Sequence, residues 1–154
     1  GMTGGQYSPT TPMDAKATTA TYGHIEPAFD ISALTATAGA SFVARSTVYH
    51  VTQLDQMLGL AIAKKEFGVV EVLSPCHTNY GRQNRLGSQV EMMKGFKKQA
   101  MRAERWDKLS PAQRKGHFAI GVLADRERPT FWDAYQGVMA RAQAASGGAS
   151  HGAR

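Results

Sequence analysis

The chain has 154 residues, a formal net charge of +6 at pH 7 and a hydrophobic content of 42%. This length suits one domain, and no apolar run reaches the roughly 20 residues that a membrane-spanning helix needs. Its single cysteine excludes an internal disulfide and is typical of a reducing compartment, so we expect a cytoplasmic protein. The basic residues are scattered, which argues against nucleic acid as a partner and leaves acidic proteins and phosphorylated ligands open.

Residues 1–29 show no hydrophobic period and predict a long loop. Its first twelve residues hold three glycines, two prolines and three threonines, a composition that fixes unusual backbone angles and offers amides and hydroxyls to a ligand. A loop of this length is usually functional. Because a natural amino terminus is usually a loose tail, we expect the chain to be a fragment whose domain begins upstream.

Helices and strands alternate after this loop. Asp30 is a good N-cap for a short helix through Ala38, with Gly39 in the stop position after it, and residues 41–45 predict a short strand. Apolar residues at helical spacing predict an amphipathic helix over 51–66. A β-branched run over 67–73 is typical of a buried parallel strand. This order of elements predicts an open α/β sheet.

The second half of the chain is predicted to be mainly helical. Residues 88–98 predict one helix, and Ser110 starts a short second one with a proline and a glutamine at its first and third positions. A late strand is expected over 118–124, followed by a helix over 130–145 that Thr130 caps. Residues 146–154, rich in Ala, Gly and Ser, are expected to be a disordered tail.

Cys76 follows the strand predicted over 67–73, at an edge where open α/β sheets bind ligands. A lone cysteine there is most often a small buried hydrophobe. The polar, basic segment that follows would instead stabilise a thiolate. Pairing with His77 is disfavoured because adjacent residues in an extended segment point in opposite directions, and a zinc site lacks further ligands nearby. One ligand of a cluster whose other ligands lie elsewhere stays open.

The opening glycines form a second candidate site. Met2-Thr3-Gly4-Gly5-Gln6 matches neither a dinucleotide fingerprint nor a Walker A loop. Glycine pairs let backbone amides approach phosphate closely, so diphosphate binding is one interpretation and a plain glycine-rich turn is the other.

Several segments form one recognisable set when they are taken together. The opening segment Gly1–Gln6 is followed by five more, which are residues 8–12, 22–31, 39–45, 70–76 and 81–87. This set resembles beta subunits of 2-oxoacid:ferredoxin oxidoreductases, most closely the 2-oxoglutarate type. The opening segment is similar to the stretch just after that family's thiamine-diphosphate motif.

The resemblance implies a fold and a division of the chain. Residues 1–86 would be the carboxy-terminal part of a thiamine-diphosphate-binding α/β domain, with an open, mainly parallel sheet and flanking helices. Residues 87–145 would be a helical C-terminal extension of the subunit, and residues 146–154 its tail.

The resemblance also implies an activity and its cofactors. Enzymes of this family oxidatively decarboxylate a 2-oxoacid with coenzyme A to acyl-CoA and CO2, and reduce ferredoxin; 2-oxoglutarate is the favoured substrate here. They contain thiamine diphosphate, Mg²⁺ and a 4Fe–4S cluster, and the beta subunit works with an alpha subunit. We do not expect the fragment to be active alone.

In the sequence, the implied sites lie at the beginning of residues 1–86 and near their end. The residues lining the thiamine cofactor would be Gly1, Met2, Thr3, Gly4, Gly5 and Gln6. Cys76 would be one cluster ligand, and the Mg²⁺ ligands would lie upstream. The alternative is a small basic binding module with a structural cysteine and no catalytic role.

Overall fold

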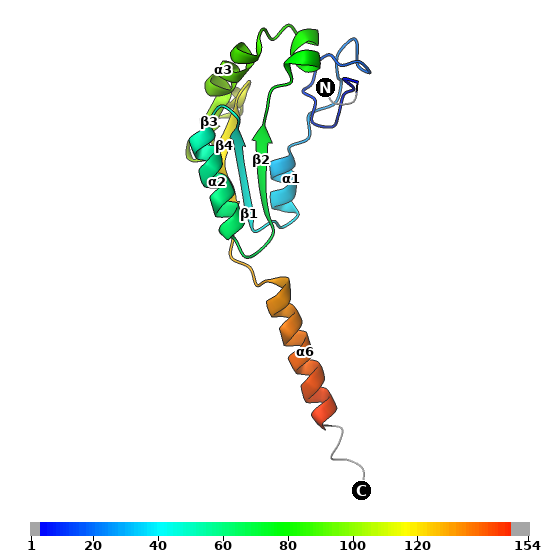
Figure 1. Ribbon diagram of the computed structural model, residues 1–154, viewed down its shortest axis with the longest axis vertical. Helices are drawn as coiled ribbons and strands as arrows, with labels where there is room; N and C mark the ends of the chain where they lie inside the picture. Colours follow the sequence, from blue (N-terminus) through cyan, green and yellow to red (C-terminus); the bar gives the residue numbers. More distant parts are fainter. Residues whose placement is uncertain (1–3, 149–154) are drawn as a thin grey trace.

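The computed structural model describes residues 4–148 of the protein (Figure 1). Its elements, in chain order, are α1 (Ile31–Thr37), β1 (Phe42–Thr47), α2 (Val51–Ala63), β2 (Gly68–Leu73), the π-helix η1 (His77–Gly81), α3 (Gln89–Gln99), β3 (Ala100–Arg102), α4 (Ala103–Trp106), α5 (Pro111–Arg114), β4 (Phe118–Asp125) and α6 (Phe131–Gly148). The predicted alternation of helices and strands is confirmed.

The strands form one four-stranded sheet in the order β2-β1-β4-β3. β1 pairs with β2 and β3 with β4 in parallel, whereas β1 and β4 are antiparallel. The prediction of an open, mainly parallel sheet is therefore confirmed. β1 is buried along its whole length because it has a strand on each side, while β2 is half-buried, since it lies at the sheet edge within the described part of the chain.

Helices cover both faces of this sheet beside β1 and β2 (Figure 1). Successive side chains of a strand point to opposite faces. Phe42 and Ala44 accordingly form the core with Met57 of α2, whereas Arg45 turns to the opposite face and meets residues at the start of α1. Burying a side chain the size of Phe42 contributes roughly 1.5–3 kcal/mol to folding.

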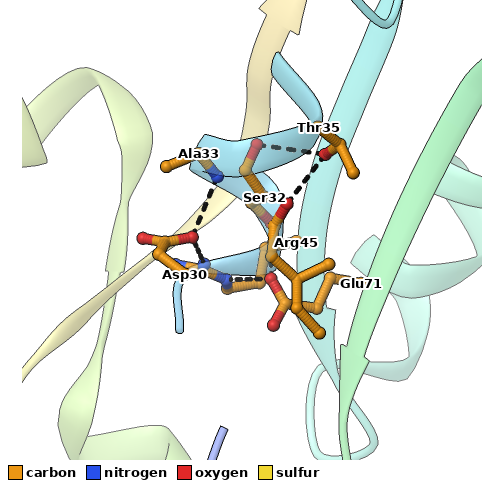
Figure 2. A network of polar contacts seen from close by, with 7 residues as sticks. Asp30, Ser32, Ala33, Thr35, Arg45 and Glu71 are labelled. Carbon is orange, nitrogen blue, oxygen red and sulfur yellow. Dashed lines mark hydrogen bonds and ion pairs between the residues drawn. The ribbon is translucent and has the colours of Figure 1, made fainter. Parts of the chain in front are cut away.

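A polar network joins the start of α1 to the sheet (Figure 2). Arg45 and Glu71 are direct neighbours in the parallel β1–β2 register, and Arg45 Nε donates to Glu71 Oε2 over 2.8 Å. The other end of the guanidinium pairs with Asp30, whose carboxylate also caps α1 by accepting from the Ala33 amide. Ser32 donates to the same Glu71 oxygen. The network thus fixes the end of the opening loop on the sheet.

The later helix starts are set by local side chains, as predicted. Ser110 caps α5 and exchanges hydrogen bonds with Gln113 in a capping box. The Thr130 hydroxyl accepts from the Asp133 amide over 2.9 Å and so caps α6. Such caps satisfy amides that have no partner inside the helix. The helix predicted over 51–66 ends earlier, at Ala63, where the backbone turns extended.

Three elements were not predicted, namely β3, the four-residue helix α4 and η1. β3 has only three residues and follows α3 without a break, which is too short for a two-residue period to be visible. η1 lies in the polar, basic segment after Cys76, for which no helix was predicted, and the Gly81 amide closes it by donating to the Cys76 carbonyl over 2.8 Å. Single π turns often lie at functional sites.

The carboxy-terminal part of the chain contributes to the sheet and to one projecting helix. β4 lies between β1 and β3, so the sheet uses residues from both sides of the division predicted at 86 and 87, which stays a prediction. α6 extends away from the sheet (Figure 1) and continues to Gly148, beyond the predicted start of the tail. Residues 149–154 of that tail lie outside the described residues. None of the helices within 4–148 is long and apolar enough to span a bilayer.

Candidate cofactor and metal site

The opening loop lies beside the segment that follows β2, near the carboxyl ends of β1 and β2 (Figure 1). Of the residues predicted to line a cofactor, Gly4, Gly5 and Gln6 belong to the described part of the chain. Gly1, Met2 and Thr3 lie outside the described residues.

Gly5 occupies a position that only glycine fits without strain. Its φ is +77°, and a Cβ added there would lie 2.7 Å from Thr18 Oγ1 and 3.3 Å from Asn79 Cγ. Thr18 closes this turn twice, because its amide donates to the Gly5 carbonyl over 2.8 Å and its hydroxyl donates to the Gly4 carbonyl over 2.7 Å. Thr18 and Asn79 therefore pack directly against the Gly5 backbone, and Gly5 is buried.

We expect Gly5→Ala to destabilise the full-length subunit by about 2 kcal/mol or more, since it adds a close contact to an unfavourable φ. Gly116→Ala is the matched control, because Gly116 has the same φ of +77° and nothing within 4 Å of an added Cβ. It should lose only about 1 kcal/mol. Denaturant unfolding of both variants checks this, and equal losses would contradict the packing assigned to Gly5.

The loop around Gly5 is internally ordered. The Asp14 amide donates to the His24 carbonyl over 2.8 Å, and the His24 amide donates to the Ala15 carbonyl over 2.9 Å. The buried His24 ring contacts the Tyr7 ring, with 4.7 Å between their centroids. These bonds hold the loop in a defined shape although it has no helix or regular strand.

Cys76 lies just beyond the carboxyl end of β2 and is half-buried. Backbone amides of Tyr80 and then Asn79 donate to its sulfur, and they lower the thiol pKa from 9.0 to about 7. The Thr78 hydroxyl, 3.9 Å from the sulfur, acts in the same direction more weakly. The sequence suggested basic side chains as the cause of thiolate stabilisation; the main cause is instead the backbone of η1.

This pKa predicts the pH dependence of Cys76 alkylation in iron-free, folded enzyme. Only the thiolate reacts with iodoacetamide. Because the folded pKa of about 7 lies below the ordinary value of 9.0, the rate should rise with pH and reach half its maximum near pH 7. In urea the midpoint should return toward about 8.5. Mass spectrometry of quenched reactions measures both midpoints, and identical midpoints would show that η1 does not stabilise the thiolate.

The fold brings the opening loop into contact with the segment that follows Cys76. Gln83 Nε2 donates to Thr18 Oγ1 over 3.4 Å, and Asn84 bonds the backbone of Lys16. A small hollow of about 30 Å³ lies at this junction. Its lining residues come from both segments and are Gly5, Gln6, Thr11, Lys16, Ala17, Tyr80 and Gln83. The sequence offered no signal for the pairing of these segments.

The described residues fit part of the cofactor set that the sequence predicts. Gly4 is exposed, with Gln6 nearest to an added Cβ at 3.6 Å, so its backbone suits close approach of a diphosphate-bearing group. The stabilised thiolate of Cys76 is a soft ligand, which suits iron in a cluster. Within residues 4–148 no group of three or more His, Cys, Asp or Glu side chains is placed to hold a metal ion. A cluster bound at Cys76 would therefore need its other ligands from outside these residues.

Comparisons with known proteins concern the family and the fold of the chain. Residues 1–72 match the family model described as thiamine pyrophosphate enzyme, C-terminal TPP binding domain. The 2-oxoglutarate synthase subunit KorB of Methanothermobacter marburgensis is 42% identical over 139 residues, which are 90% of this chain and 49% of that subunit. The KorB subunit of Methanocaldococcus jannaschii is 41% identical over 131 residues, which are 85% of this chain and 48% of that subunit.

A solved structure supports the fold. It is a 2-oxoglutarate:ferredoxin oxidoreductase from Magnetococcus marinus with 2-oxoglutarate, coenzyme A and succinyl-CoA bound, and the TM-score is 0.73. The match covers 92% of this chain and 49% of that chain at 22% sequence identity. Together with the curated relatives, of which this chain spans about half the length, it confirms the predicted resemblance: the chain is a relative of the beta subunits of 2-oxoacid:ferredoxin oxidoreductases.

Proposed function

We propose that this chain is part of an enzyme that oxidatively decarboxylates a 2-oxoacid with coenzyme A, yields acyl-CoA and CO2, and reduces ferredoxin. 2-Oxoglutarate is the favoured substrate, since the KorB relatives are named as 2-oxoglutarate synthase subunits. One observation supports this activity most directly. The glycine loop of the thiamine-type domain packs against the segment that carries the stabilised Cys76 thiolate, which would put an electron-releasing cofactor beside an electron acceptor.

Thiamine diphosphate is the cofactor we assign to the opening loop, in agreement with the family match over residues 1–72. When bound, it supplies the electron sink that decarboxylation requires, while the protein supplies orientation and electrostatics. In this chain the exposed Gly4 would admit the cofactor, while Gly5 and Thr18 would hold the turn rigid. Met2, with its neighbours in Gly1–Gln6, would brace the cofactor. Mg²⁺ would be held by residues outside those described.

Cys76 would supply one ligand of a 4Fe–4S cluster. Because the amides of Tyr80 and Asn79 lower the thiol pKa to about 7, a larger share of Cys76 is already thiolate near pH 7, and iron binding has less proton to displace. Hydrogen bonds to cluster sulfurs also influence the reduction potential. Arg82 and Arg85, both exposed in the same segment, would offset part of the cluster's negative charge.

The partners would be an alpha subunit, ferredoxin, coenzyme A and the 2-oxoacid, in the cytoplasm. The relatives are named as subunits, which supports a partner chain. The single cysteine suits a reducing compartment.

Anaerobic reconstitution tests the activity. The full-length subunit and its partner subunit, supplied with thiamine diphosphate and Mg²⁺, should reduce ferredoxin only when both coenzyme A and a 2-oxoacid are present. We expect 2-oxoglutarate to give the highest kcat/KM among 2-oxoacids of different side-chain length and charge. A protein that binds neither thiamine diphosphate nor iron would support the alternative, a basic binding module.

A further inference from the structure

The side chain of Asn84 bridges the opening loop and the segment that carries Cys76. It is half-buried in the turn just after η1. Its Oδ1 accepts from the Lys16 amide over 2.7 Å, and its Nδ2 donates to the Lys16 carbonyl over 2.9 Å. The same Nδ2 donates to the Tyr80 carbonyl, also over 2.9 Å.

These three hydrogen bonds link the backbone at Lys16 to the backbone at Tyr80, which is far away in the sequence. The reciprocal pair with Lys16 resembles the pairing between strand residues, with an amide side chain in place of one peptide. Lys16 takes part through its main chain, and its side chain is exposed. Gln83 adds a longer bond of 3.4 Å to Thr18 beside it. The opening loop is therefore held against η1 chiefly by hydrogen bonds between the Asn84 side chain and backbone groups.

Tyr80 links the hydrogen bonds of Asn84 to the sulfur of Cys76. Its carbonyl accepts from both the side chain and the backbone amide of Asn84. Its own amide is the main hydrogen-bond donor to Cys76. A shift of the loop at Lys16 would thus move Asn84, then Tyr80, and would change the hydrogen bond that stabilises the thiolate.

We propose that Asn84 is a positioning residue that couples occupancy of the cofactor loop to the environment of the Cys76 sulfur. This inference rests on the function proposed above. Binding of thiamine diphosphate to the loop would restrain the Lys16 backbone further and, through Asn84, hold the Tyr80 amide on the sulfur. Coupling of this kind is reciprocal, so binding of the cluster would likewise strengthen binding of the cofactor.

Hydrogen–deuterium exchange of the full-length, assembled enzyme tests the coupling, with and without thiamine diphosphate and Mg²⁺. In the unmodified enzyme the cofactor should slow exchange about fivefold or more in residues 4–24 and also in residues 76–85. In Asn84→Ala the first effect should persist and the second should disappear. Gln56→Ala, which removes an exposed amide side chain from α2, should behave like the unmodified enzyme.

A spectroscopic readout separates coupling from a general loss of structure. The cofactor should change the electron paramagnetic resonance spectrum of the reduced cluster in the unmodified enzyme and leave it unchanged in Asn84→Ala. Asn84→Asp keeps the side-chain volume and the acceptor for the Lys16 amide but loses both donated bonds, so it serves where alanine prevents folding, with the same expected loss.

Two results would overturn the inference, and they differ from failure of the proposed function. Retention of both cofactor effects in the Asn84 variants would mean that the cofactor acts on η1 directly. If the unmodified enzyme binds both cofactor and cluster but the cofactor changes neither exchange in residues 76–85 nor the cluster spectrum, the coupling is contradicted and the proposed function is not. An enzyme that binds neither would contradict the proposed function itself.

Discussion

Replacing Cys76 with serine in the full-length, assembled enzyme should remove most of the cluster. Iron and sulfide content, visible absorption and the electron paramagnetic resonance signal should all fall, and ferredoxin reduction should fall at least tenfold. The physical reason is that a serine hydroxyl must lose a proton of far higher pKa than the thiol, whose pKa η1 lowers to about 7. Metal analysis of anaerobically purified protein measures the loss.

Ser74→Ala is the control for this substitution. Ser74 is exposed two residues before Cys76 in the same segment, so its loss perturbs the local chain without removing the sulfur. Iron content should remain at the level of the unmodified enzyme. Full iron content and an unchanged signal in Cys76→Ser would show that Cys76 is not a ligand, and would return it to the class of buried structural thiols.

Arg45→Met should destabilise the subunit by about 3 kcal/mol, because it breaks a buried ion pair and leaves the partner carboxylate uncompensated. The side chains of Arg45 and Glu71 are 10% and 16% exposed, and Ser32 alone would remain on the Glu71 oxygen. The double variant Arg45→Met/Glu71→Leu should recover part of this loss, since an apolar pair of similar volume costs less than one unpaired charge. Denaturant unfolding of both variants measures the difference.

Lys64→Met provides a matched comparison at the surface. Lys64 also pairs with two carboxylates, Asp125 and Glu127, but these are 56% and 95% exposed. Exposed pairs contribute little because solvent screens them, so the loss should be much smaller than for Arg45→Met. Similar losses in the two variants would contradict the central role given to the network of Figure 2.

Local patterns in the sequence were sufficient for much of the fold. The caps at Ser110 and Thr130 act within three residues, so each helix start is encoded where it occurs. The parallel pairing of β1 with β2 follows from a β-branched run joined to the preceding strand by a helix. β3 was missed because its three residues form a strand only through pairing with β4, and that is a tertiary effect.

The sequence singled out the residues of the candidate site, whose roles stay predictions, but not the contacts that surround them. Gly5 stood out by glycine density, and its positive φ explains why that residue type is required. Cys76 stood out by its position after a strand. The amides that lower its thiol pKa could not be anticipated, because every residue except proline carries one and only the π turn aims them at the sulfur.

The bond between Asn84 and Lys16 has a consequence for how this subunit can vary. One side of the contact is a specific amide side chain, while the other is a peptide group that almost any residue supplies. Residue 84 should therefore change rarely, whereas residue 16 is free to vary in size and charge as long as it is not proline, which has no amide hydrogen to donate. Positions 84 and 16 are therefore not expected to covary among related sequences, although the two residues are hydrogen-bonded in the structure.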